Sequence, residues 1–348
     1  MIQPFFTKEP KWLDRWDTYL QQTAQGSYIL LSDWVQSYAS YGFDFELCLF
    51  VKDDTIVGGF NAVVAKVAFF KFYIIPYGPI ATDNEASVLD VLVTKVAQRA
   101  VEIKACYCQI NLPFLFNHPD FPALREYESG QLFKYVFALN GLNWIDLKDY
   151  TDAEMLLADF KSSVRRDIRS SIRQGLSVAF LSDENEIKKA YDLCVSNASE
   201  RNYAIRDWKD VQESILSLIE KNYAKFIVAY KDGEMKGAIF IVKAGNYYNY
   251  LFGGTKKEKP DLLVGHFLQW EALKLSIEER CIGYNISLGG SQGVVAFKNN
   301  FNAVEVLFQH SKHYKVINSF LFSFFLYFEK YIKPYKKTIA KVLSYLKK

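Results

Sequence analysis

The sequence is poor in the residues that build disulfide scaffolds and metal sites. Its 348 residues include five cysteines, four histidines and three methionines. An odd number of cysteines in a long chain argues against a secreted disulfide framework and favours a reducing compartment. Cys106 and Cys108 form only a C-x-C, with no second pair and no histidine at ligand spacing. We therefore interpret them as two small buried hydrophobic side chains and expect no metal site.

Long hydrophobic runs are also missing. The first residues contain no apolar run followed by a small-residue cleavage site, so we expect no signal peptide. The longest strongly apolar run, residues 316–328, has 13 residues. A helix needs about 20 to span a bilayer. The sequence therefore favours a cytoplasmic protein without a membrane span.

Charge is scarce overall but unevenly distributed. With 50% hydrophobic and 23% charged residues, the chain can bury a full core, and its length suggests two domains. The 42 basic and 39 acidic residues give a formal charge of +3, which excludes a protein that is basic throughout. Residues 311–348 contain nine lysines and one glutamate, a local charge of +8, so the rest of the chain carries −5. A mildly acidic body ends in a basic tail.

An internal repeat organises the chain. Each half begins with a predicted hairpin of alternating apolar positions, with Asp53-Asp54 at the turn in one half and Asp232-Gly233 in the other. An aromatic strand, an amphipathic helix and a short strand follow in the same order. The matched segments are 45–65 and 225–243 for the hairpins, 69–79 and 246–254 for the aromatic strands, 85–104 and 261–278 for the helices, and 106–112 and 281–288 for the last strands.

This order predicts an α+β fold with two tandem units, each a mixed sheet flanked by helices. We expect an N-terminal domain over residues 1–145, a C-terminal domain over 146–315 and a basic tail over 316–348. One large mixed sheet in which hairpins recur by accident is the alternative.

Several short motifs appear in a fixed order in the second half. They occupy residues 163–169, 173–178, 197–203, 248–255, 260–270, 284–290 and 297–301, the last reading Phe-Lys-Asn-Asn-Phe. The first half adds Ser32-Asp33-Trp34 and Pro76-Tyr77-Gly78-Pro79. The ordered set resembles the FemAB family, whose members contain two halves of the N-acyltransferase (GNAT) fold. Two positions depart from the family pattern: no lysine follows Trp34 closely, and Asn285 stands where the family often has Asp.

The resemblance implies transfer of an aminoacyl group from aminoacyl-tRNA to an amine of a lipid-linked or nucleotide-linked cell-wall precursor. Relatives with a wider substrate range are thought to use other activated donors, including acyl-CoA. Direct transfer from an ester or thioester to an amine needs no covalent enzyme intermediate and no bound cofactor. It needs a group that stabilises the oxyanion and a route for the amine proton.

Lys298 is our candidate for the oxyanion-stabilising residue, because it is the lysine of the Phe-Lys-x-x-Phe motif. The alternative is a surface lysine whose stem lies on Phe297 or Phe301. The resemblance further suggests substrate contacts for Trp34, Tyr248, Tyr250, Asn285 and Phe297. The tyrosines of the aromatic strand are also typical of a core or a pocket wall.

Residues 160–173 are predicted to form a helix with Arg165, Arg169 and Arg173 in a stripe beside its apolar face. Arginine forks suit phosphate, so the stripe is a candidate site for a pyrophosphate or a tRNA backbone. A solvated helix face has the same pattern. The string nearest to a coenzyme A loop, residues 280–285, leads into a strand rather than a helix, and we discount it.

The tail combines aromatic residues with lysines. Residues 336–348 are predicted to form a basic amphipathic helix suited to an anionic bilayer surface. The alternative is that the aromatic stretch 316–328 packs on the second domain and only the last lysines are solvated.

The sequence is compatible with three hypotheses about function. The first is a FemAB-like aminoacyl or acyl transferase, peripheral to the inner face of the plasma membrane. The second is an acyl-CoA-dependent N-acyltransferase acting on an amino sugar or a small amine. The third is an inactive duplicate that binds an envelope lipid or a partner.

Overall fold

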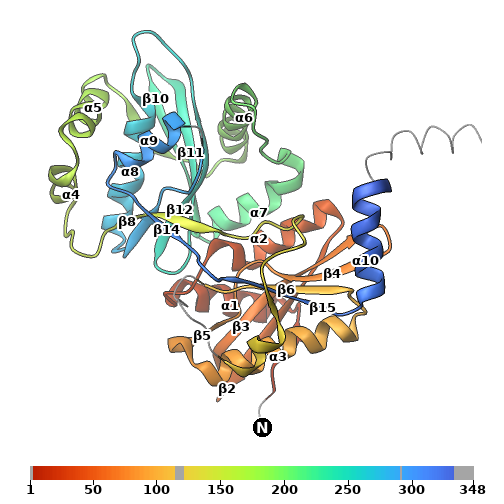
Figure 1. Cartoon of the computed structure of the whole chain (residues 1–348). Helices are drawn as coiled ribbons and strands as arrows, with labels where there is room; N and C mark the ends of the chain where they lie inside the picture. Colours follow the sequence, from red (N-terminus) through yellow and green to blue (C-terminus); the bar gives the residue numbers. More distant parts are fainter. Residues whose placement is uncertain (1–2, 114–120, 291, 333–348) are drawn as a thin grey trace, which may run out of the picture. The chain divides into compact units, whose positions relative to one another are not determined.

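The computed structural model describes residues 3–113, 121–290 and 292–332, which form two compact units (Figure 1). The first unit consists of Met1–Lys8, Tyr41–Ala138 and His310–Lys348. The second consists of Glu9–Ser40 and Leu139–Gln309. The units are therefore discontinuous in sequence, whereas we expected single cuts after residues 145 and 315.

The first unit is built on an eight-stranded sheet. Its path is β1-β2-β3-β4-β6-β15-β7, and β5 pairs with β3. The strands are β1 (Phe5–Thr7), β2 (Asp44–Lys52), β3 (Thr55–Val67), β4 (Phe70–Ile75), β5 (Ile80–Ala81), β6 (Tyr107–Asn111), β7 (Glu128–Ser129) and β15 (Lys312–Val316). The helical segments are α3 (Ala86–Glu102), α10 (Ser319–Tyr327) and the short turns η2 (Ser37–Tyr41), η3 (Thr82–Asn84), η4 (Pro122–Glu126) and η5 (Phe328–Ile332), of which η2 begins in the other unit.

The two faces of this sheet are covered by different helices. Tyr73 and Ile75 of β4 lie in a core with the apolar side of α3. Phe70 and Phe72, which alternate with them along the strand, contact Phe325 of α10 instead. The aromatic tail segment therefore packs on the first unit, not on the second as our alternative had it.

The second unit is built on a seven-stranded sheet in the order β14-β8-β13-β12-β11-β10-β9. The strands are β8 (Gly141–Asp146), β9 (Ser177–Phe180), β10 (Ala224–Lys231), β11 (Glu234–Lys243), β12 (Tyr247–Thr255), β13 (Gly283–Asn285) and β14 (Val304–Leu307). The helices are α1 (Pro10–Gln22), η1 (Tyr28–Leu30), α2 (Ser32–Gln36), α4 (Ala153–Asp159), α5 (Ser162–Arg173), α6 (Glu184–Glu200), α7 (Trp208–Glu220), α8 (Val264–Glu278) and α9 (Gln292–Asn299).

Helices also cover both faces of the second sheet. Ile227 and Ile239 lie in a core with α4, α5 and α8. Phe226 and Phe240, on the opposite face, join an aromatic cluster that reaches Tyr191 of α6 through Phe252. Figure 1 shows α8, α4 and α5 on one side of this sheet and α6 and α7 on the other.

The predicted repeat and fold class are confirmed. The series β2-β3-β4-α3-β6 in the first unit matches β10-β11-β12-α8-β13 in the second. In both, the strand before the helix pairs in parallel with the strand after it, as a helical crossover allows. The hairpin turns have positive φ at Asp53 (48°) and Asp54 (58°), and at Asp232 (51°) and Gly233 (76°). Such two-residue turns match the twist of the flanking strands.

All five cysteines are free and buried, as we expected for Cys106 and Cys108. Trp34 lies in the second unit, although its motif belongs to the first half of the sequence. The predicted amphipathic helix over 336–348 lies outside the described residues.

Candidate active site in the second unit

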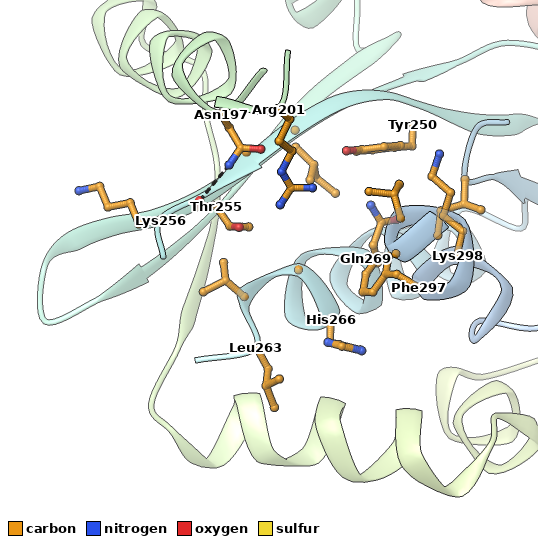
Figure 2. Close-up of a pocket in the computed structure, with 18 of the residues that line it drawn as sticks. Asn197, Arg201, Tyr250, Thr255, Lys256, Leu263, His266, Gln269, Phe297 and Lys298 are labelled. Carbon is orange, nitrogen blue, oxygen red and sulfur yellow. Dashed lines mark hydrogen bonds between the residues drawn. The ribbon is translucent and has the colours of Figure 1, made fainter. Parts of the chain in front are cut away.

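The candidate site forms where two parallel strands of the second unit separate. β12 and β13 are paired only over Tyr247–Asn249 and Gly283–Asn285, because β13 ends there while β12 continues to Thr255. Next to the separated strands is a cavity of 460 Å³. A second one of 740 Å³ shares six of its lining residues, namely Asn197, Arg201, Tyr250, Gly253, Val294 and Lys298. We call the two together the strand cavity, and Figure 2 shows the first of them.

The glycine at position 253 keeps the floor of the strand cavity open. A Cβ atom there would lie 2.8 Å from the carbonyl oxygen of Ala238 and 3.0 Å from the hydroxyl of Tyr250. Contacts this short are not tolerated by backbone atoms, so a larger residue would displace β12 or close the cavity. At Gly254 a Cβ atom would instead meet α6, 2.9 Å from the Leu193 carbonyl oxygen, so the second glycine allows the close packing of that helix.

Lys298 lies in the wall of the strand cavity and is only 5% exposed. From α9, its Nζ donates to the Ser287 carbonyl oxygen (3.0 Å), the Ser287 Oγ (2.8 Å) and the Gly289 carbonyl oxygen (3.0 Å). No carboxylate forms an ion pair with it in the described part of the chain. Burial therefore lowers the pKa of Lys298 to about 8. The alternative that Lys298 is a surface lysine is wrong.

Lys298 and the loop after β13 stabilise each other. Ser287 and Gly289 adopt positive φ angles of 66° and 76°, and the carbonyl oxygens of both accept bonds from the amine. An ammonium with a pKa about 8 is still mostly charged at neutral pH, so its charge can stabilise a developing oxyanion. All three of its N–H groups donate to Ser287 and Gly289, so a direct hydrogen bond to the oxyanion replaces one of these bonds. In its neutral form the same amine can accept a proton.

The side chain of Asn285 holds the start of this loop by hydrogen bonds. Its Oδ1 accepts bonds from the backbone N–H groups of Asn143 and Ser287, both at 3.1 Å, and its Nδ2 donates to Asn249 Oδ1 (3.0 Å). Asn285 is 4% exposed and is not one of the described residues that line the cavity. We predicted a substrate contact here, but the side chain instead fixes the backbone beside the cavity.

Polar groups line the other walls of the strand cavity. Figure 2 shows the guanidinium of Arg201 directed into the cavity from the end of α6 and Tyr250 across it from β12. Asn197 is held by a bond from its Nδ2 to the Thr255 carbonyl oxygen (3.1 Å). Gln269 accepts a bond from the buried Tyr284 hydroxyl (2.8 Å) through Oε1, and among the described residues no group accepts from its amide nitrogen. Arg201 and Gln269 thus offer donors to a ligand.

An aromatic wall lies beside the first turn of α8. The His266 ring packs edge-on against Phe297 at 4.9 Å, and its Nε2 is 3.9 Å from a carboxylate oxygen of Asp167. Burial is the largest effect on the His266 pKa and lowers it, so the ring is mostly neutral at pH 7. Val264 and Gly265, at the start of α8, also border the cavity.

The predicted arginine stripe does not reach the cavity. The helix begins at Ser162, so Phe160 precedes it. Arg165 donates to the carbonyl oxygens of Ala158 (2.6 Å) and Phe160 (2.7 Å), which end α4. Arg169 and Arg173 are exposed, and none of the three is among the described cavity residues. Arg165 therefore has a structural contact, and a phosphate role for the stripe stays a prediction.

Two further candidates lie elsewhere in the second unit. Tyr248 is fully buried, and its hydroxyl donates to Glu279 Oε1 (3.1 Å), as our core alternative for the tyrosines predicted. Trp34 on α2 packs against Tyr28, with ring centroids 5.1 Å apart. The strand cavity thus brings together Lys298, Tyr250 and Phe297 of the predicted residues and adds Asn197, Arg201, His266 and Gln269.

No three His, Cys, Asp or Glu side chains in the described part of the chain gather in a way that would hold a metal ion. Nor is any of its helices long and apolar enough to cross a membrane.

Comparisons with known proteins agree with this architecture. Residues 158–298, which include Lys298 and most of the strand cavity, match the family model of an acetyltransferase (GNAT) domain. Curated proteins give no match to the sequence. The crystal structure of FemX is similar over 92% of this chain and 99% of its own, with a TM-score of 0.78 and 14% identity.

Two other solved structures are similar over most of the chain. One is the C-terminal domain of a putative lysylphosphatidylglycerol synthetase from Agrobacterium fabrum, with a TM-score of 0.54, 12% identity and coverage of 87% and 90% of the two chains. The other is a conserved protein of unknown function from Bacteroides thetaiotaomicron, with a TM-score of 0.57, 13% identity and coverage of 89% and 98%. At these identities the likeness shows the fold, which is the tandem GNAT fold that the resemblance implied.

Proposed function

We propose that this chain, which has the tandem GNAT fold of FemX, is a transferase that moves an aminoacyl or acyl group from an activated donor to an amine. The observation that carries the proposal is Lys298, a buried amine without a carboxylate partner in the described residues, in the wall of the strand cavity of a GNAT domain. A buried cation with free space beside it suits a reaction that develops negative charge on oxygen.

The chemistry assigned to the cavity is a direct transfer. The nitrogen of the acceptor attacks the carbonyl carbon of the donor ester or thioester, and the new C–N bond replaces the C–O or C–S bond. Negative charge develops on the carbonyl oxygen, where the Lys298 ammonium stabilises it. The amine proton leaves to a base and finally reaches the leaving oxygen or sulfur.

We assign the donor to the strand cavity because its polar groups suit phosphate and carbonyl oxygens. The Arg201 guanidinium offers a fork of donors, whereas the Nζ of Lys256, which also borders the cavity, is paired with Glu234 (2.7 Å). The first turn of α8 also borders the cavity, and its N–H groups favour anions. Aminoacyl-tRNA and acyl-CoA both present phosphates next to an activated acyl group, so both are candidate co-substrates.

For the acceptor we propose a lipid-linked or nucleotide-linked cell-wall precursor, used at the inner face of the plasma membrane. Support comes from the likeness to FemX and from the FemAB-like motifs. The competing acceptor is an amino sugar or small amine with acyl-CoA as donor, which the match to an acetyltransferase domain favours.

A donor test distinguishes these proposals. The purified protein is mixed with membrane lipid extract and supplied in parallel with tRNA charged with labelled amino acids and with labelled acetyl-CoA. Lys298→Ala serves as the site variant, and Lys209→Ala, an exposed lysine on α7, is the matched control. We expect label to move from tRNA to the lipid fraction with the wild type and the control, and a loss of about 10²- to 10³-fold with Lys298→Ala.

Each other outcome has a defined meaning. Label that moves only from acetyl-CoA to a soluble amine replaces the proposed function with the acyl-CoA-dependent reaction. Transfer that persists in full in Lys298→Ala removes Lys298 from the chemistry. Absence of transfer from both donors contradicts the proposed function and favours an inactive binding protein.

A further inference from the structure

Helix α10 of the first unit has one buried and one exposed aromatic side. Its nine residues include no charged side chain. Phe322 and Phe325 are buried, with Phe325 5.3 Å from Phe70 and 4.6 Å from Phe72, and Phe322 stacked on Tyr107 at 5.0 Å. These contacts fix the helix on the sheet. The remaining aromatic side chains of the helix therefore point away from the sheet in a defined direction.

The outer side forms an apolar surface that continues onto neighbouring segments. Phe320 is 79% exposed, and Phe69, in the turn between β3 and β4, is 64% exposed. Phe324 connects them, since its ring is 5.8 Å from that of Phe69. Tyr327 and Tyr331 extend the surface along η5, with ring centroids 4.9 Å apart. We call these five residues the aromatic face.

Such a surface is unusual for a part of a protein that only meets water. Single exposed apolar residues are common, but contiguous large ones mark a site of contact with a partner or a membrane. The position of the two tyrosines at one end resembles the distribution of amphipathic aromatic rings at a membrane interface, where the hydroxyl stays near water.

One described lysine borders the aromatic face, and the sequence that follows it is basic. Lys330 is exposed, with its Nζ 5.0 Å from the Tyr331 ring centroid. The sequence after residue 332 adds six lysines and neither Asp nor Glu. Glu329, the only acid after residue 310, is partly buried and accepts a bond from the Tyr135 hydroxyl.

We propose that the aromatic face docks the protein on an anionic lipid bilayer, with the rings in the interfacial region and the lysines on the headgroups. The charge distribution favours this occupant, because lysines near an anionic surface are attracted to it and aromatic side chains enter the interface between headgroups and acyl chains. A second copy of the chain would bring together two copies of Lys330 and of the basic sequence that follows it. This docking goes beyond the proposed transfer and does not depend on it.

Vesicle co-sedimentation of the full chain tests the proposal without any acyl donor. The vesicles contain phosphatidylglycerol and phosphatidylethanolamine in one series and only phosphatidylcholine in the other. The test variant is Phe69→Ser with Phe320→Ser, two exposed positions where the change leaves the core intact. Tyr41→Ser, 52% exposed elsewhere in the first unit, is the matched control.

We expect the wild type and the control to bind the anionic vesicles and not the neutral ones. Loss of two interfacial rings lowers the partition coefficient of the double variant by roughly tenfold or more. Raising sodium chloride from about 0.1 M to about 0.5 M weakens binding of the wild type severalfold, because salt screens the lysines. Circular dichroism confirms that the double variant is folded.

A second measurement reports contact with lipid directly. Phe320→Trp is quenched by brominated lipid in anionic vesicles, whereas Tyr41→Trp is not. Binding of the double variant equal to that of the wild type, or equal quenching at both positions, overturns the proposal. A dimer in light scattering that dissociates in the double variant, together with no vesicle binding, assigns the face to a second copy and also overturns it.

Discussion

Lys298 joins two properties that rarely coincide in one side chain, namely burial and the lack of a carboxylate partner in the described residues. If its ammonium stabilises the oxyanion, kcat/KM decreases as pH rises through about 8, where the amine loses its proton. The measurement is the pH profile of transfer for the wild type and for Lys298→Arg. The arginine variant keeps its charge to higher pH, so we expect a lower rate without the decrease near pH 8. Identical profiles would contradict the role of the Lys298 charge.

The lowered pKa of Lys298 also predicts how the free energy of unfolding depends on pH. In the native state Lys298 loses its proton near pH 8, whereas in the unfolded chain it does so near its ordinary value of 10.5. Between these values the unfolded state binds more protons, so the free energy of unfolding contributed by Lys298 rises with pH. We therefore expect the free energy of unfolding of the wild type, relative to that of Lys298→Met, to increase from pH 8 to pH 10. Urea unfolding at both values measures it, and a constant difference would refute the lowered pKa.

The hydrogen bonds of Asn285 explain why an amide rather than a carboxylate occupies this position. Its Nδ2 donates to Asn249 Oδ1, so Asn285→Asp would place two acceptor oxygens against each other inside the protein. We expect a loss of about 1–3 kcal/mol in the free energy of unfolding, measured in urea. Asn185→Asp, an exposed position in the first turn of α6, is the control and stays within about 0.5 kcal/mol.

At the scale of elements, the hairpins could be predicted because their turns carry residues that adopt positive φ and their strands alternate. The strand cavity could not, because it depends on where β13 stops pairing with β12. Lys298, Tyr250 and Phe297 were found through motifs. Arg201 and Gln269 lie in the motifs 197–203 and 260–270, but they were not selected as site residues, because a motif does not show which of its side chains face a cavity.

Helix α10 has the role of a core element and not of a detachable tail. Phe325 is fully buried, so Phe325→Ala should cost about 3–5 kcal/mol in the free energy of unfolding. The exposed Phe320→Ala, one turn earlier, should cost less than about 0.5 kcal/mol. Thermal or urea unfolding of the two variants checks this. Equal effects would show that α10 does not pack on the sheet.

At the scale of the whole molecule, the duplication was visible in the sequence, but the sequence did not show which chain segments form each unit. β15 pairs with β6 across about 200 residues of chain, and no local pattern indicates such a pairing. We therefore expect that residues 146–315, cut at the sequence boundaries, do not fold cooperatively alone. This fragment lacks α1, α2 and nearly all of β8, which lies inside the sheet. Circular dichroism with urea titration tests this, and a two-state transition of the fragment would contradict it.

The alternation of the chain between the two units has a consequence for biosynthesis. The second unit has all of its segments once residue 309 has left the ribosome, whereas the first still lacks β15 and α10. Until then, the apolar faces of β4 and β6 that α10 covers have no native partner. The second unit is thus the first that can complete its fold on a nascent chain, and the first unit, although its synthesis begins earlier, keeps an uncovered apolar sheet face until the last segments emerge.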